Sequence, residues 1–414
     1  MNKEFYIENR KKLIASMDDN SAMVIFAGRA PKKSADESYG FTPNRNFYYL
    51  TGIDRENPVL VMVKSGSKTE ELLFIEKSDP VFARWYGEKM TTEEARQASG
   101  IEDIRYIDSF EARINFIINN MGVENIYVDL ERDSWSDLPT YPQEFAAQVK
   151  SKYPAVAIKN AYSNICHLRG LKSPEEIDTI RKAIDITRMG ILSMMKHARP
   201  GMMEYEIESW FNQTLTANGV RDFAFKTIAA AGINGTVLHY SSNTSRCGDN
   251  DLILCDLGAE WQYYKADITR TFPVNGRFTD KQKQVYNIVL KANEEVIKTA
   301  KAGVTKAELE SAAQKVLADG CRELGLIKED SELRNYYFHS IGHPLGLDTH
   351  DVKDGRPVLE AGAVYTDEPG LYIPEWEIGV RIEDDILITE NGCEVLSKNI
   401  IKTVEEIEEF MKNR

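Results

Sequence analysis

The sequence predicts two domains, an α/β domain over residues 1–165 and an α+β domain with an internal repeat over residues 172–414. At 414 residues the chain is too long for one ordinary hydrophobic core. Its first part alternates apolar, β-rich runs at residues 22–26 and 58–63 with helical stretches such as residues 91–99. This alternation is typical of an α/β domain, and a repeat follows it.

A helix start marks the beginning of the second domain. Ser173 is a suitable N-cap, Pro174 occupies the first helical position, and Glu175 and Glu176 place acidic side chains in the first turn. We therefore place the domain boundary just before this segment.

Two helix-turn-helix segments of the second domain resemble each other at an offset of 102 residues, the separation of Gly201 and Gly303. A Glu-x-Glu triplet follows each glycine, at residues 206–208 and 308–310, and a β-rich stretch follows each helix pair. The repeat predicts two half-domains related by a pseudo-twofold axis, with a cleft between their sheets.

The composition argues against several classes of protein. A hydrophobic content of 42% with 28% charged residues is typical of a globular protein, and no apolar run reaches the ~18 residues of a membrane span. A net charge of -14 disfavours nucleic acid as a partner. Because the first residues lack the apolar run of a signal peptide, we expect a cytoplasmic protein. The five cysteines are odd in number and scattered along the chain, so we expect them to be reduced packing residues. They are Cys166, Cys247, Cys255, Cys321 and Cys393.

Acidic residues mark the ends of several predicted strands in the second domain. Asp256 ends one apolar run and Asp267 opens the next, so a hairpin would bring both carboxylates to one end of a sheet. Glu368 precedes a Pro-Gly pair, and alternation along a strand over residues 379–388 would place Arg381 and Glu383 on one face.

The neighbouring Asp384 and Asp385 are expected to be solvated strand-end acids.

Four clustered carboxylates need positive charge if they are buried together. Two divalent cations would balance them and could accept a bridging hydroxide, the nucleophile for hydrolysis at neutral pH. A donor set rich in oxygen with one imidazole favours manganese, although cobalt, iron or zinc would also fit.

Histidines gather in the same domain as the acids. His339, His343 and His350 lie within twelve residues, in a glycine-containing segment, and His239 lies in an apolar stretch upstream. Such a group is more typical of a reactive site than a single buried histidine is. The cluster over residues 338–351 is therefore the expected source of the imidazole ligand.

These motifs together resemble the family of aminopeptidase P and prolidase. The segment 45–52 is similar to the N-terminal domain of aminopeptidase P. The segments 267–276, 368–372 and 381–385, with the histidine cluster between the first two, are similar to its catalytic domain. The resemblance implies the pita-bread fold, shared with methionine aminopeptidase and creatinase, and a hydroxide that bridges two divalent metal ions.

The resemblance also implies roles for individual residues. Asp267 and Glu383 would bridge both ions, and Glu368 would also pass a proton to the leaving prolyl nitrogen. His350 and His239 would hold the substrate and stabilise the tetrahedral intermediate. The implied metal ligands are Asp256, Asp267, His343, Glu368 and Glu383. The implied catalytic residues are His239, His339, His350, Glu368 and Arg381. The implied substrate-binding residues are His239, His350, Tyr372 and Arg381.

The expected function is that of an Xaa-Pro aminopeptidase, which removes the N-terminal residue from peptides with proline at position 2. The alternatives are an Xaa-Pro dipeptidase (prolidase) and a non-catalytic, peptide-binding pita-bread protein. A prolidase would need an arginine to clamp the dipeptide carboxylate, and the candidates are Arg356 and Arg381. The resemblance places Arg381 against the metal carboxylates, and Arg356 lies in a polar loop expected to be mobile. We also expect a homo-oligomer, in which Trp85 either packs in its own chain or reaches a neighbouring active site.

Overall fold

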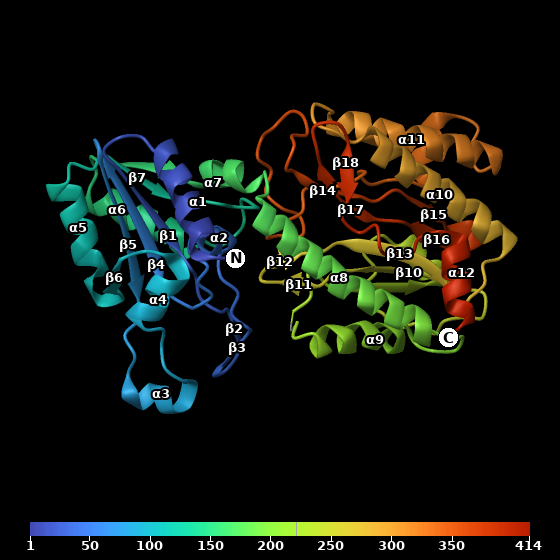
Figure 1. Ribbon diagram of the computed structural model, residues 1–414, viewed down its shortest axis with the longest axis horizontal. Helices are drawn as coiled ribbons and strands as arrows, with labels where there is room; N and C mark the ends of the chain where they lie inside the picture. Colours follow the sequence, from blue (N-terminus) through green and yellow to red (C-terminus); the bar gives the residue numbers. More distant parts are fainter. Residues whose placement is uncertain (221) are drawn as a thin grey trace. The chain divides into compact units, whose positions relative to one another are not determined.

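The computed structural model of the protein describes residues 1–220 and 222–414. The chain divides into two compact units, Met1–Arg169 and Gly170–Arg414, which are labelled by element in Figure 1. Both units contain helices and strands and have buried cores of their own. The fold class predicted from the sequence is observed, with an α/β unit preceding an α+β unit.

The N-terminal unit is built on a six-stranded sheet in the order β6-β5-β4-β1-β7-β8. Only β4 runs antiparallel to its neighbours, and the other neighbouring strands are parallel. A short β2–β3 hairpin stands apart from this sheet. The strands are β1 (Ser21–Phe26), β2 (Lys32–Ser34), β3 (Glu37–Ser38), β4 (Val59–Ser65), β5 (Lys68–Ile75), β6 (Asp103–Tyr106), β7 (Asn125–Val128) and β8 (Ala157–Asn160).

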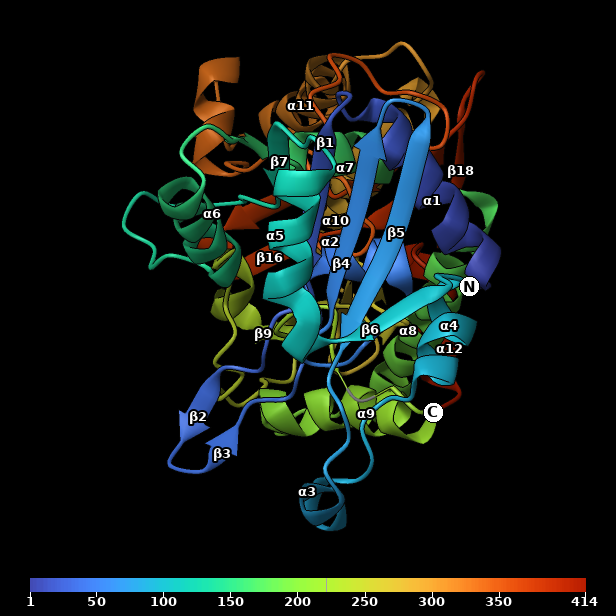
Figure 2. The ribbon, with the colours of Figure 1, turned by 90° about the vertical axis from the view of Figure 1, so that its left-hand side faces the viewer.

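Helices cover both faces of this sheet. Alternate residues of β1, namely Ala22, Val24 and Phe26, pack with Phe110 of α5 and Phe145 of α6 in one core. Helices α1 and α2 contact β4 and β1, and Figure 2 shows α5 in front of the sheet. The helices are α1 (Lys3–Ser16), α2 (Arg45–Thr51), α3 (Pro80–Tyr86), α4 (Thr92–Ser99), α5 (Phe110–Asn120), α6 (Tyr141–Lys152) and α7 (Tyr162–Arg169).

The C-terminal unit places its strands between two helix pairs, α8–α9 and α10–α11 (Figure 1). The helices are α8 (Pro174–His197), α9 (Glu204–Ala217), α10 (Asp280–Thr299), α11 (Lys306–Glu323) and α12 (Val404–Lys412). The strands are β9 (Ile228–Ala231), β10 (Leu252–Leu257), β11 (Glu260–Trp261), β12 (Tyr264–Lys265), β13 (Ile268–Pro273), β14 (Val364–Asp367), β15 (Gly370–Ile373), β16 (Ile378–Arg381), β17 (Asp384–Ile388) and β18 (Cys393–Val395).

The internal repeat predicted from the sequence is visible in this unit. Gly201 and Gly303 occupy the turns between the paired helices with φ of 86° and 87°, a left-handed conformation that favours glycine. Each helix pair is followed by a three-stranded sheet, β13-β10-β9 in the first copy and β14-β17-β18 in the second. Ser173 caps α8 as predicted, because its side chain accepts a hydrogen bond from the Glu176 amide.

Two features of the described residues relate to the composition. Within the described residues, no helix has both the length and the apolar character needed to cross a membrane. The five cysteines are unpaired and four of them are buried, which agrees with packing residues.

Candidate metal centre

The antiparallel pair β10–β13 brings Asp256 and Asp267 together. Asp256 lies opposite Thr269, and Leu257 lies opposite Ile268. Asp267 directly precedes β13 and therefore lies at the same end of the pair as Asp256. The predicted hairpin is confirmed, although its connection carries the two short paired strands β11 and β12 in place of a simple turn.

The pair β14–β17 supplies the second two carboxylates. Asp367 ends β14 and lies opposite Asp384, the first residue of β17. Glu368 directly follows the former and Glu383 directly precedes the latter, so both lie at one end of this strand pair. Each half of the repeat thus contributes two acids from the ends of an antiparallel pair.

The single strand expected over residues 379–388 is interrupted. Strand β16 ends at Arg381 and pairs with β15, whereas β17 begins at Asp384 and lies between β14 and β18. Arg381 and Glu383 still meet, at the hydroxyl of Thr269. Arg381 Nε donates to Thr269 Oγ1 at 3.0 Å, and this hydroxyl donates to Glu383 Oε2 at 2.6 Å. Thr269, from the first half of the repeat, therefore holds Arg381 and Glu383 together. Their alternation along one strand does not.

His343 approaches the carboxylates from the segment between α11 and β14. Its Nε2 lies 3.4 Å from Asp267 Oδ2 and 3.7 Å from Glu368 Oε1. Its Nδ1 lies 3.0 Å from the carbonyl oxygen of Pro344, and a proton on Nδ1 would leave Nε2 as the lone-pair nitrogen. The preceding residue must be small, because a Cβ on Gly342 would lie 2.1 Å from the carbonyl oxygen of Thr366.

These side chains form a donor set that fits divalent metal. One ligand atom each from Asp267, His343 and Glu383 lie within 4.8 Å of one another. Asp256 Oδ1 is buried without a hydrogen-bond partner among the described residues. Burial and the neighbouring acids raise the pKa of Asp267 and of Glu383 well above their ordinary values. Such mutual destabilisation of buried carboxylates is relieved by a bound cation.

Arg381, Tyr372 and His339 form one hydrogen-bonded chain that begins at Asp256. The buried Arg381 donates to Asp256 Oδ2 at 2.5 Å and to Tyr372 Oη at 3.0 Å. The same Tyr372 hydroxyl lies 2.9 Å from His339 Nε2. Burial, and then Arg381, lower the pKa of His339 to about 4, so this imidazole is neutral at physiological pH.

His350 and His239 lie on the exposed side of the centre. The ring of His350 contacts the ring of His343 edge-on, with 4.2 Å between centroids. Burial first, and then the nearby His239, lower the pKa of His350. Both His350 and His239 are exposed, so an incoming molecule can reach them.

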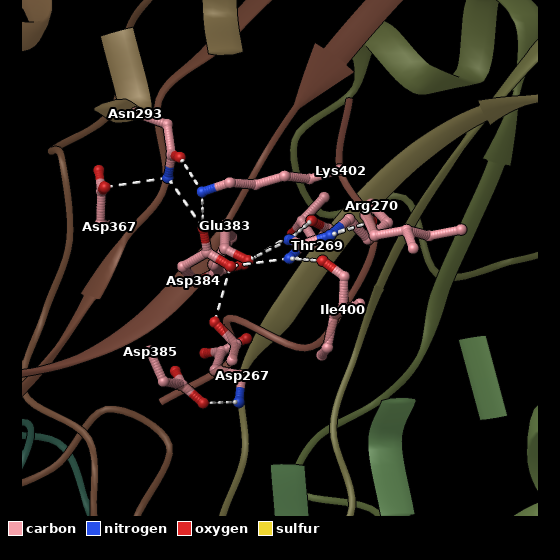
Figure 3. A network of polar contacts seen from close by, with 12 residues as sticks. Asp267, Thr269, Arg270, Asn293, Asp367, Glu383, Asp384, Asp385, Ile400 and Lys402 are labelled. Carbon is pink, nitrogen blue, oxygen red and sulfur yellow. Dashed lines mark hydrogen bonds and ion pairs between the residues drawn. The ribbon is translucent and has the colours of Figure 1, made fainter. Parts of the chain in front are cut away.

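Asp384 and Asp385 are buried, so their assignment as solvated strand-end acids is wrong. Asp384 accepts hydrogen bonds at 2.7 Å from Arg270 and Lys402 (Figure 3), and a third at 2.7 Å from Ser397. Burial alone would raise the pKa of Asp384, but Arg270 and Lys402 hold it below its ordinary range. The prediction failed because β17 is the central strand of its sheet, and its first residues do not reach the surface.

Arg270 connects this buried network to the candidate centre. Its guanidinium donates to the carbonyl oxygens of Thr269 at 2.9 Å and Glu383 at 2.6 Å. It also donates to the carbonyl oxygens of Ile401 at 3.1 Å and Ile400 at 3.3 Å, in the segment before α12 (Figure 3). Sequence reasoning missed Thr269 and Arg270. The available indication was a polar and a charged residue inside a strand that also contains Ile268 and Phe272, because burying such residues is costly unless they find partners.

Two further sequence expectations concern single residues away from this donor set. Arg356 is engaged by neighbouring acids, because its guanidinium pairs with Asp354 and lies 3.1 Å from Glu360, and its side chain is only 11% exposed. Trp85 is 79% exposed on α3 and does not pack in a core of its own chain.

Sequence comparisons place the whole chain among metallopeptidases. The pattern described as "Metallopeptidase family M24" matches residues 178–390, and "Aminopeptidase P, N-terminal domain" matches residues 6–127. The Xaa-Pro aminopeptidase of Escherichia coli K12 is 34% identical over 99% of this chain and 98% of its own length. That of Haemophilus influenzae is 33% identical over 99% of this chain and 97% of its own length.

Solved structures agree with these relatives. A protein structure from Bacillus anthracis is 50% identical with a TM-score of 0.98, and the match covers 100% of this chain and 99% of that one. Escherichia coli aminopeptidase P with the inhibitor Pro-Leu is 32% identical with a TM-score of 0.91, covering 100% of this chain and 99% of that one. Together with the donor set, the family indicates that this chain binds divalent metal. The chain belongs to metallopeptidase family M24 and, within it, to the Xaa-Pro aminopeptidases.

Proposed function

We propose that the chain hydrolyses the bond between an N-terminal residue and a following proline, with two divalent metal ions at the candidate centre. The donor set carries this proposal, because ligand atoms of Asp267, His343 and Glu383 lie within 4.8 Å of one another, and Glu368 Oε1 lies 3.7 Å from His343 Nε2. The exposed His239 and His350 lie beside this set. The proposed ligands are Asp256, Asp267, His343, Glu368 and Glu383. Four carboxylates balance two divalent ions, and the oxygen-rich set favours Mn²⁺ over Co²⁺, Fe²⁺ or Zn²⁺.

The protein's own groups are suited to the acid–base steps. Bound divalent ions supply an activated water and polarise the scissile carbonyl. Glu368 can take a proton from that water and pass it to the prolyl nitrogen, because its carboxylate lies in the donor set, with Oε1 3.7 Å from His343 Nε2. His350 and His239 are positioned to donate hydrogen bonds to the peptide and to stabilise the developing oxyanion. Arg381 and Tyr372 orient Asp256 and His339 through the chain described above.

The arginines support an aminopeptidase over a prolidase. A prolidase needs a cation to bind the free carboxylate of the C-terminal proline. Arg356 and Arg381 are the two candidates for this role. Arg381 is used by Asp256 and Tyr372, and Arg356 by Asp354 and Glu360. With both engaged, the substrate can continue beyond proline. A non-catalytic peptide-binding role is less consistent with a full set of five ligands.

The expected homo-oligomer and cytoplasmic location also remain proposals. Trp85 is exposed, as are Val81, Phe82 and Tyr86 on the same short helix. This exposed apolar group supports a contact with another copy of the chain in solution.

Loss of a bridging carboxylate should remove both metal and activity. We expect Asp267→Asn or Glu383→Gln to retain fewer than two ions and to lose about a hundredfold or more in kcat, because an amide carries no charge and bridges poorly. Elemental analysis and a peptide assay measure the two effects. The control variant Glu102→Gln changes an exposed acid and should retain both the two metal ions and the parent kcat. Two retained ions with near-normal turnover would disprove these ligand roles.

His350→Ala should behave differently from a ligand substitution. We expect the metal content to stay at the parent level while kcat falls about 10²- to 10³-fold, because this imidazole contacts the reacting carbonyl and not the ions. His343→Ala is the matched comparison and should lose metal. Metal loss in the His350 variant would show that the two histidines had been assigned in the wrong order.

The length of the preferred substrate separates the two peptidase types. We expect X-Pro-Y tripeptides to be cleaved with a kcat/KM at least about tenfold above that of X-Pro dipeptides in a manganese-supplemented assay. Peptides without proline at position 2 should be poor substrates. Preference for the dipeptide would make prolidase the correct function.

The metal-free protein should lose stability as pH rises. The folded-state pKa of Glu368 is about 7 against an ordinary 4.5, and those of Asp267 and Glu383 are shifted in the same direction. The folded state therefore binds these protons more tightly, and the stabilisation is lost as pH rises through the raised values. The Tm difference between Mn²⁺-loaded and chelator-treated protein should widen from pH 4.5 to pH 7. A difference that stays constant or narrows would contradict this.

A further inference from the structure

The N-terminal unit contains a cavity of about 440 Å³. All of its lining residues lie between residues 26 and 142, so it is separate from the candidate metal centre of the C-terminal unit. Four of its lining residues follow the carboxyl ends of parallel strands: Gly28 after β1, Glu76 after β5, Ile107 after β6 and Asp129 after β7. In open α/β sheets, ligands bind in the crevice at this edge of the strands. The volume is within the range of small-molecule sites.

Asp129 is the group in this cavity that most needs a ligand. It is 4% exposed, and its Oδ2 accepts hydrogen bonds from Asn46 at 2.8 Å and from Asn44 at 3.3 Å. Its Oδ1 is buried and has no hydrogen-bond partner in the part of the chain that the structure describes. Because an unsatisfied buried carboxylate oxygen is costly, a hydrogen-bond donor in the cavity would stabilise it.

The walls beside Asp129 are apolar and aromatic. Phe26, Ile107 and Tyr141 line the cavity, and the ring of Phe26 meets the ring of Tyr141 edge-on at 4.9 Å. Tyr141 remains 54% exposed, so its side chain is accessible to a bound molecule. The guanidinium of Arg29 lies 6.0 Å from the centre of this ring, at the distance of a cation–π contact.

The charges of the lining favour a cation over an anion. The cavity is lined by three carboxylates, on Glu76, Asp129 and Glu131, and by one guanidinium, on Arg29. Glu76 pairs with Lys89 at 2.6 Å, and Arg29 donates a hydrogen bond to Asn57. An anion would meet this net negative lining, whereas a nitrogen cation would meet an oxygen of Asp129 that lacks a donor.

We propose that this cavity binds a small organic cation with a flat apolar body, such as an aromatic amidinium, guanidinium or ammonium compound. The cationic nitrogen donates to Asp129, and the apolar body lies against Phe26, Ile107 and Tyr141. This site is independent of the proposed peptide hydrolysis, so either proposal can fail while the other stands.

Calorimetric titration of the metal-loaded full chain with benzamidine tests the proposal, and benzamide is the neutral compound of the same shape. We expect benzamidine to bind at least about tenfold more tightly than benzamide, and benzoate to bind no better than benzamide. Equal affinity of benzamidine and benzamide, or no binding of benzamidine up to about 10 mM, overturns the proposal.

Variants locate the binding. We expect Asp129→Asn and Tyr141→Ala each to weaken benzamidine at least about fivefold. Asp108→Asn, at an exposed acid beside Ile107, and Asp267→Asn, at the metal centre, should leave the affinity unchanged. Tyr141 is exposed, so its variant still decides the question if Asp129→Asn fails to fold. Unchanged affinity in the Tyr141 variant, or loss in the Asp267 variant, places the compound elsewhere and overturns the proposal.

Discussion

Repulsion among buried carboxylates is the constraint on which the C-terminal unit depends. Asp267 and Glu383 are 4% and 2% exposed, and burial, together with neighbouring acids, raises the pKa of both well above the ordinary values. Arg381 supplies one positive charge and forms an ion pair with Asp256. Apolar packing cannot offset the remaining charge, because desolvation of an ionised carboxylate costs far more than burial of a side chain returns. In the folded chain these acids are neutralised either by bound protons, as their raised pKa values show, or by cations, and the set of oxygen and nitrogen ligands suits divalent metal.

The repeat explains how one chain can hold so many acids together. Each half ends an antiparallel strand pair in two carboxylates, and the two pairs meet at β13. Thr269 supports this junction from both its hydroxyl and its backbone, since its carbonyl oxygen also accepts a hydrogen bond from the Glu383 amide at 3.1 Å. Arg270 lies beside it and donates to both halves and to the segment before α12. Its guanidinium pairs with the buried Asp384, which also pairs with Lys402, each at 2.7 Å.

Unsatisfied carboxylate oxygens occur in both units, and their surroundings give them different meanings. At the metal centre several acids and an imidazole converge, which favours a divalent ion with oxygen and nitrogen ligands. In the N-terminal cavity a single buried Asp129 lies beside aromatic and aliphatic walls, which favours a nitrogen cation attached to an apolar body. That crevice forms where the parallel strands of the N-terminal sheet end, and all of its lining residues come from the N-terminal unit.

The sequence by itself determined what depends on local order. The alternation of strands and helices, the Ser173 cap, the repeat marked by Gly201 and Gly303, and the hairpin that joins Asp256 to Asp267 all follow from neighbouring residues. Tertiary structure alone decided what depends on burial and on distant partners. Asp384 and Asp385 were expected to be solvated, but they are buried because β17 is the central strand of its sheet. The ion pairs of Arg356 with Asp354 and Glu360 could not be predicted from its polar loop. Arg381 and Glu383 meet through Thr269, more than a hundred residues away. The physical reason is that the free energy of a charged side chain is set by what surrounds it, and the chain order does not specify those surroundings.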